Sequence, residues 1–140
     1  MKQNIDTRTV ADLIKDAGYE HSRHECETED GYIVQLDRVA NKSAFNVILF
    51  MHGVLDSSQT WVVHGRDRSA AYLAHRQGFD VYMGNFRGIY PRKLAPWKQK
   101  SAVSYWNYNI DHLAKYDIAA FIKTIIEVKV HEIKKMIVLQ

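Results

Sequence analysis

The chain has 140 residues, of which 46% are hydrophobic and 25% charged, as is usual for one globular domain. Its formal net charge is only +3, and the basic residues are scattered without regularly interleaved aromatic side chains, so we expect no nucleic-acid partner. The single cysteine, Cys26, excludes an intrachain disulfide. The N-terminus lacks the apolar core of a signal peptide, and no apolar run approaches the roughly 20 residues that span a bilayer.

The N-terminal third predicts a short helix followed by a β-hairpin. Residues 9–17 place apolar side chains at helical spacing behind a Thr9 capping box, and Gly18 is a natural stop. Residues 19–28 and 32–39 read as two strands, and the Asp-Gly pair between them is a strong hairpin signal. We therefore expect an antiparallel pair of strands at the start of the sheet.

Residues 46–51 form an unbroken apolar run, Asn-Val-Ile-Leu-Phe-Met, that is followed at once by His52-Gly53. A continuous run of this kind predicts a strand buried on both faces in the middle of a parallel sheet. Open α/β sheets bind ligands outside the carboxyl ends of their strands. The loop after this strand is therefore the first candidate for a functional site.

The second half of the chain alternates helices and strands. We predict a helix over 69–77, a strand over 79–84, a long loop over 85–100, a helix over 110–126 and a strand over 136–140. A hairpin followed by β-α-β-α-β predicts a mixed, mainly parallel sheet with helices on its faces.

The loop that begins at His52 directly follows the predicted buried strand and could supply part of an oxyanion hole. Such a site needs backbone N–H groups aimed at a developing alkoxide. The Val54 N–H is the candidate donor, Gly53 lets the backbone approach closely, and His52 suits a packing or orienting role better than that of a base. The alternative is an ordinary glycine-assisted turn between a strand and a loop.

Other candidate chemistry is weak. No glycine pair brackets a serine as G-x-S-x-G, and the two serines near the loop, Ser57 and Ser58, are expected to satisfy nearby backbone groups. His21-x-x-His24-x-Cys26 lacks further ligands that would complete a metal site, so we expect no metal and no cofactor. Asp117, near the apolar face of the long helix, is expected to bond a neighbouring loop.

Together these stretches resemble the acid lipase family of α/β hydrolases, the gastric and lysosomal lipases and their steryl-ester-hydrolysing relatives. The resemblance covers nearly the whole chain, in order. Its motifs are Ala17-Gly18-Tyr19, Glu27 to Ile33, His52 to Ser58 with Trp61, Gly78 to Gly88, and Trp106, Asp111, Ala114, Tyr116-Asp117-Ile118 and Ala120.

The resemblance implies an incomplete α/β-hydrolase fold, with residues 1–140 as the N-terminal part of one domain that ends at the strand before the nucleophile elbow. It implies hydrolysis of triacylglycerols, steryl esters or related lipid esters through a serine acyl-enzyme. Val54 is carried over as the first oxyanion donor, and a second loop, formed by Gly84, Asn85, Arg87 and Gly88, is carried over as the part that shapes the floor of the site. Family members are often secreted or lysosomal.

The family's nucleophile would follow just after Gln140, and the acid, the histidine and the cap would come later still. We therefore expect the 140 residues alone to be inactive, and to self-associate through an exposed hydrophobic strand at 136–140. One other hypothesis is a non-catalytic product that binds a partner through its sheet edge. Another is an α/β hydrolase of other chemistry, such as a peptidase or epoxide hydrolase, which the segments Thr28 to Tyr32 and Gly84 to Gly88 disfavour.

Overall fold

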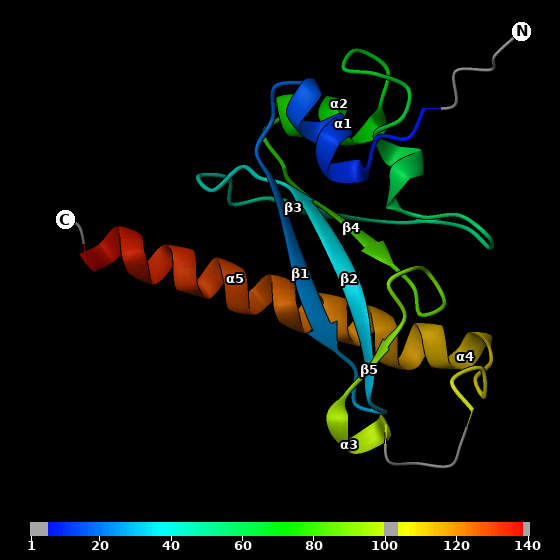
Figure 1. Cartoon of the computed structure of the whole chain (residues 1–140). Helices are drawn as coiled ribbons and strands as arrows, with labels where there is room; N and C mark the ends of the chain where they lie inside the picture. Colours follow the sequence, from blue (N-terminus) through cyan, green and yellow to red (C-terminus); the bar gives the residue numbers. More distant parts are fainter. Residues whose placement is uncertain (1–5, 100–103, 139–140) are drawn as a thin grey trace, which may run out of the picture.

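A computed structural model describes residues 6–99 and 104–138 (Figure 1). The elements in the first part are α1 (Val10–Asp16), β1 (His21–Glu27), β2 (Tyr32–Val39), β3 (Val47–Met51), the 3-10 helix η1 (Ser58–Trp61), α2 (Ala70–Arg76), β4 (Asp80–Asn85), β5 (Lys93–Leu94) and α3 (Pro96–Gln99). The second part contains, from residue 110 on, one long helical segment made of α4 (Ile110–His112), the π-helical turn η2 (Leu113–Asp117) and α5 (Ile118–Val138).

The strands form one mixed sheet in the order β1-β2-β4-β3, with the short β5 beside β2. β1 pairs antiparallel with β2, β2 pairs antiparallel with β4, and β3 runs parallel to β4. The predicted class, an incomplete α/β-hydrolase fold with an N-terminal hairpin and a mixed sheet, is confirmed. The sheet is not mainly parallel as predicted, because among the described strands only β3 and β4 pair in parallel. The parallel pair matters most for function, because it brings the carboxyl ends of β3 and β4 to the same edge of the sheet.

Helices cover both faces of the sheet (Figure 1). The side chains of Val81 and Met83 join a core cluster with α1 and α2, whereas Tyr82 between them joins a second cluster with α5. This alternation follows from the two-residue period of a strand. Phe121 of α5 is fully buried in the second cluster and anchors the long helix across the sheet.

The predicted local signals are confirmed at the N-terminal elements. The Thr9 hydroxyl accepts from the Asp12 N–H and the Asp12 carboxylate accepts from the Thr9 N–H, which completes the capping box of α1. Gly31 in the hairpin turn has φ +88°, and a Cβ there would lie 2.7 Å from the Trp97 ring. Only glycine fits both the backbone conformation and the space.

The prediction that 46–51 is a central strand buried on both faces is wrong for the part of the chain that the structure describes. β3 lies at the end of the sheet order, and all of its residues are half-buried. Its side chains do pack on both faces, with Ile48 and Phe50 toward one cluster and Leu49 and Met51 toward the other. The apolar run therefore reflects helices above and below, while the outer edge of β3 has no described strand beside it.

The predicted strand at 136–140 also differs from the structure, because α5 continues to Val138; residues 139 and 140 lie outside the described residues. The spacing of Ile126, Val130, Ile133 and Ile137 extends the helical repeat through this segment. A helix satisfies its own backbone hydrogen bonds, whereas a strand needs a paired neighbour. The predicted loop over 85–100 likewise contains β5 and α3. None of the described helices combines the length and the apolar character needed to cross a membrane.

Candidate functional site

Two loops that the sequence singled out meet at one edge of the sheet. Met51, the last residue of β3, lies opposite Gly84 of β4 in the parallel register. The two strands therefore end next to each other, and the loop 52–55 that follows β3 lies beside the loop 86–89 that follows β4. The predicted oxyanion loop and the predicted site-shaping loop are thus brought together by strand pairing.

His52 joins these two loops by hydrogen bonds. It is 7% exposed, its Nδ1 lies 2.7 Å from the Gly53 carbonyl oxygen, and the Phe86 N–H donates to its Nε2 at 3.1 Å. Its ring also meets the Phe86 ring edge-on, with the centroids 5.2 Å apart. Both ring nitrogens are engaged by backbone groups, which fits the orienting role predicted for His52.

An apolar cleft of about 550 Å³ opens between the two loops and the helical segment that precedes α5. One wall carries Val54 and Leu55, whose side chains are 85% and 99% exposed. The opposite wall carries Trp106, Tyr108, Ile110, Leu113, Ala114 and Ile118. Exposed apolar side chains gathered around one cleft mark a binding surface for an apolar ligand.

The sequence did not predict this second wall. Trp106 was noted only as part of a family motif, and Ile110 only as the first position of the predicted helix over 110–126. Ile110 is 70% exposed, so its apolar character serves the cleft rather than the core. Leu113 and Ala114 of this wall lie in the π-helical turn, and π turns often occur at functional sites.

Asn85, one of the predicted site-shaping residues, is the last residue of β4 and belongs to a buried polar network. Its Oδ1 accepts from the Ser58 N–H at 2.9 Å, and its Nδ2 donates to the Asp37 carboxylate at 3.1 Å. The Ser58 hydroxyl donates to the same carboxylate at 2.7 Å. The hydroxyl therefore binds a side chain and not the local backbone group that was predicted, whereas Ser57 does accept from the backbone, at the Gln59 N–H.

Asp37 is the centre of that network and is fully buried. Burial alone would raise the pKa of its carboxyl, but hydrogen bonds from His21 and Arg23 outweigh burial and lower the pKa to about 2. His21 Nε2 and Arg23 Nε each lie 2.8 Å from Oδ1. His21 is thus engaged with Asp37, while Cys26 packs in the α5 cluster on the other face of β1.

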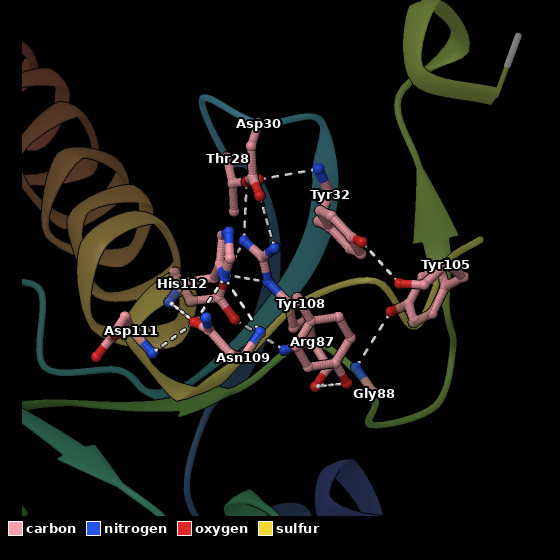
Figure 2. A network of polar contacts seen from close by, with 11 residues as sticks. Thr28, Asp30, Tyr32, Arg87, Gly88, Tyr105, Tyr108, Asn109, Asp111 and His112 are labelled. Carbon is pink, nitrogen blue, oxygen red and sulfur yellow. Dashed lines mark hydrogen bonds and ion pairs between the residues drawn. The ribbon is translucent and has the colours of Figure 1, made fainter. Parts of the chain in front are cut away.

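Arg87 is the second buried hub, and Figure 2 shows it among Asp30, Tyr32 and Tyr108. Its guanidinium donates to Asp30 at 2.7 and 2.8 Å and to Asp117 at 2.7 and 2.8 Å. Asp117 therefore bonds a neighbouring loop, as predicted. Burial raises the pKa of Asp117, whereas at Asp30 the hydrogen bonds from Arg87 and Thr28 outweigh burial and lower the pKa.

The two glycines predicted to shape the site are required by close contacts, and the structure places Gly84 in β4 and Gly88 in the loop after it. A Cβ on Gly84 would lie 2.7 Å from both the Met51 sulfur and the Phe121 ring. Gly88 has φ +96°, and a Cβ there would lie 2.7 Å from the Tyr108 hydroxyl. These glycines let β3, α5 and the wall of the cleft approach the end of β4.

Comparison with known proteins shows which proteins this chain resembles. Residues 10–65 match the family model described as the partial alpha/beta-hydrolase lipase region. The chain is 30% identical over 128 residues to human gastric triacylglycerol lipase, covering 86% of this chain and 32% of that protein. It is 32% identical over 124 residues to human lysosomal acid lipase/cholesteryl ester hydrolase, covering 84% and 31%. The predicted resemblance to the acid lipases is confirmed.

A further relative, the lipase lipl-5 of Caenorhabditis elegans, is 34% identical over 129 residues, covering 86% of this chain and 32% of that protein. The chain thus spans about a third of the length of the curated relatives it matches. Among solved structures, the epoxide hydrolase VrEH1 of Vigna radiata superposes with a TM-score of 0.52 at 23% identity, covering 76% of this chain and 28% of that one. At this identity the likeness shows the fold alone.

Proposed function

Since this chain resembles the acid lipase family of α/β hydrolases over most of its length, we propose that it is the N-terminal part of a lipid ester hydrolase domain. In the proposed enzyme, a serine attacks the ester carbonyl and the Val54 N–H donates to the oxygen that becomes negatively charged. The nucleophile, the second oxyanion donor, the acid and the histidine are assigned to residues after Gln140. Gly84, Asn85, Arg87 and Gly88 hold the floor of the site in a structural role.

The observation that carries this proposal is the apolar cleft beside Val54. Its volume of about 550 Å³ and its wall of Trp106, Ile110 and Leu113 suit an alkyl chain better than a polar substrate. Val54 and Leu55 stay largely exposed to water in the folded chain. A bound acyl chain would cover this apolar surface, which favours binding. An ester carbonyl at the mouth of the cleft would then lie near the Val54 backbone.

The 140 residues alone are proposed to be catalytically inactive. The printed sequence holds no G-x-S-x-G, and the Ser58 hydroxyl is buried and donates to Asp37. Loss of the whole catalytic triad costs several orders of magnitude in rate. We expect no turnover of p-nitrophenyl butyrate by the purified chain above the buffer rate. Turnover that a serine-directed phosphonate abolishes would contradict this.

Lipid binding is testable without catalysis. We expect dodecanoate, titrated below its micelle concentration into the ¹⁵N-labelled chain, to shift the amide signals of the cleft residues saturably. Ala114→Trp fills the cleft from an exposed helix position and should abolish these shifts. Ala119→Trp, on the same helical segment but lining a different groove, is the matched control. Unchanged binding by Ala114→Trp, or shifts spread over the whole surface, would refute a lipid site in this cleft.

A second candidate function is association through the sheet edge, without catalysis. It is favoured by β3, which within the described residues has a neighbour on one side only, and by Phe45, which is 87% exposed two residues before that strand begins. Such edges pair readily with other strands. We expect concentration-dependent dimers in sedimentation velocity that Phe45→Lys weakens. Ile137→Lys, at an exposed position of α5, is the control and should leave the dimer intact. A monomer at all concentrations would exclude this function.

A further inference from the structure

We propose that His52 is a positioning residue that holds the Gly53–Val54 peptide in one orientation and strengthens its N–H as a hydrogen-bond donor. This inference rests on the proposed function, in which the Val54 N–H is an oxyanion donor. It goes further, because it assigns the orientation and donor strength of the Val54 N–H to one tautomer of the His52 side chain.

The contacts of His52 fix its tautomer. The Phe86 backbone N–H can only donate, so Nε2, at 3.1 Å, must be the acceptor and carry no proton. The Gly53 carbonyl oxygen can only accept, so Nδ1, at 2.7 Å, must carry the proton and donate it. His52 is therefore neutral, with its proton on Nδ1. Any other state of the ring would break one of the two hydrogen bonds.

The bond to Gly53 determines where the Val54 N–H points. The carbonyl of Gly53 and the N–H of Val54 belong to the same peptide unit, which is planar and trans. In a trans peptide the C=O and N–H point in opposite directions, so a carbonyl held against the His52 ring turns the N–H away from that ring. Within the described part of the chain this N–H meets no protein acceptor, and Val54 lines the cleft.

The same contacts polarise the peptide. The donated Phe86 N–H draws electron density from the imidazole, which makes Nδ1–H a stronger donor to Gly53. A hydrogen bond to a carbonyl in turn makes the N–H of that peptide a stronger donor, because chains of hydrogen bonds polarise one another. A run of four groups, from Phe86 through His52 and Gly53 to Val54, thus links the end of β4 to the proposed oxyanion donor.

The unsubstituted chain provides the first test. In ¹⁵N-histidine-labelled protein at neutral pH, two-bond ¹H–¹⁵N correlations of the His52 ring should show a protonated Nδ1 and an unprotonated Nε2. The opposite tautomer, a rapidly exchanging mixture, or a doubly protonated ring would overturn the proposal. This measurement requires neither lipid binding nor catalysis. The His52 tautomer can therefore be confirmed even if the chain binds no lipid, and it can be refuted even if the chain does bind lipid.

Two variants separate the two ends of the ring. His52→Asn keeps an N–H near the Nδ1 position, and His52→Gln keeps an acceptor near the Nε2 position. We expect His52→Gln to move the Gly53 carbonyl ¹³C and Val54 ¹⁵N shifts upfield while the Phe86 amide stays protected from exchange. His52→Asn should instead speed Phe86 exchange roughly tenfold and leave the Gly53 carbonyl shift closer to the original.

If His52 only fills space, both variants should change the Gly53 carbonyl shift and the Phe86 amide exchange to the same extent. That outcome, or unchanged Gly53 and Val54 shifts in His52→Gln, would overturn the proposal. If either variant fails to fold, the tautomer measurement on the unsubstituted chain still decides it.

Discussion

Arg87 donates to the Asp117 carboxylate from its backbone N–H at 2.9 Å and from its guanidinium at 2.7 and 2.8 Å. One carboxylate on the π-helical turn thereby holds both the main chain and the side chain of the loop that follows β4. This contact joins the loop after β4 to the helical wall of the cleft, since Gly88 of that loop and Leu113 of that wall both line the cleft. Both side chains are fully buried, so their ionic contact is shielded from solvent.

Removing the buried charge of Arg87 should destabilise the fold more than removing the charge of an exposed arginine. We expect Arg87→Met to lower the free energy of unfolding by about 3–5 kcal/mol in urea titrations, because Asp30 and Asp117 would lose their shared partner. Arg68→Met, at an exposed position, is the matched control and should change stability by less than about 0.5 kcal/mol. Equal effects of the two substitutions would contradict a structural role for the Arg87 contacts.

Acid should destabilise the fold partly through Asp37. Its pKa falls from 3.8 to about 2 on folding, so the ionised carboxylate favours the folded state by about 2 kcal/mol above pH 4. Because the folded pKa is the lower one, this contribution is complete above the unfolded pKa and is lost as the pH falls from about 4 to about 2. Urea titrations at a series of pH values should show the loss.

Asp37→Asn isolates that contribution. The variant should be less stable than the parent at pH 7, and the difference between the two should shrink as the pH approaches 2. Asp67→Asn removes an exposed carboxyl and serves as the control. A stability difference that stays constant over the whole range would show that Asp37 does not titrate with folding.

Leu55 is the described non-glycine residue with positive φ, at +62°. The left-handed conformation costs a leucine about 1–2 kcal/mol, and its side chain is 99% exposed, so no burial offsets the strain. Leu55→Gly should therefore raise the free energy of unfolding by about 0.5–1 kcal/mol after the larger backbone entropy of glycine is subtracted. Val54→Gly, without positive φ at that position, should instead lower it. If both substitutions destabilise equally, the strain is absent in solution.

The sequence predicted what depends on local signals. The capping box at Thr9, the hairpin turn at Gly31 and the glycine stop of α1 at Gly18 each have a short-range physical cause, and all appear in the structure. The loops after β3 and β4 were also identified, because residue types such as Gly53 and Gly88 mark places where a backbone must turn.

Features that depend on distant contacts were not predictable in the same way. The ion pair of Arg87 with Asp30 joins residues 57 positions apart, and the role of Ile110 in the cleft depends on which helical face the fold leaves open. The apolar run at β3 indicated burial but not position in the sheet. The apolar residues at 136–138 likewise suit either a strand or a helix. The outcome depends on whether a neighbouring strand is available for pairing, and α5 continues through them.

Cys26 should be chemically silent in the folded protein. Its side chain is 1% exposed in the α5 cluster, and burial raises the pKa of the thiol from 9.0 to about 11. The reactive thiolate is then about a hundredfold scarcer at neutral pH, in addition to the loss of access. We expect Ellman's reagent to label the native chain at least about a hundredfold more slowly than the urea-unfolded chain. Ser43→Cys in a Cys26→Ala background places the single thiol at an exposed position and should react at the unfolded rate under native conditions. Rapid labelling of native Cys26 would mean that α5 leaves the sheet often, and the packing of the long helix over β1 would then have to be revised.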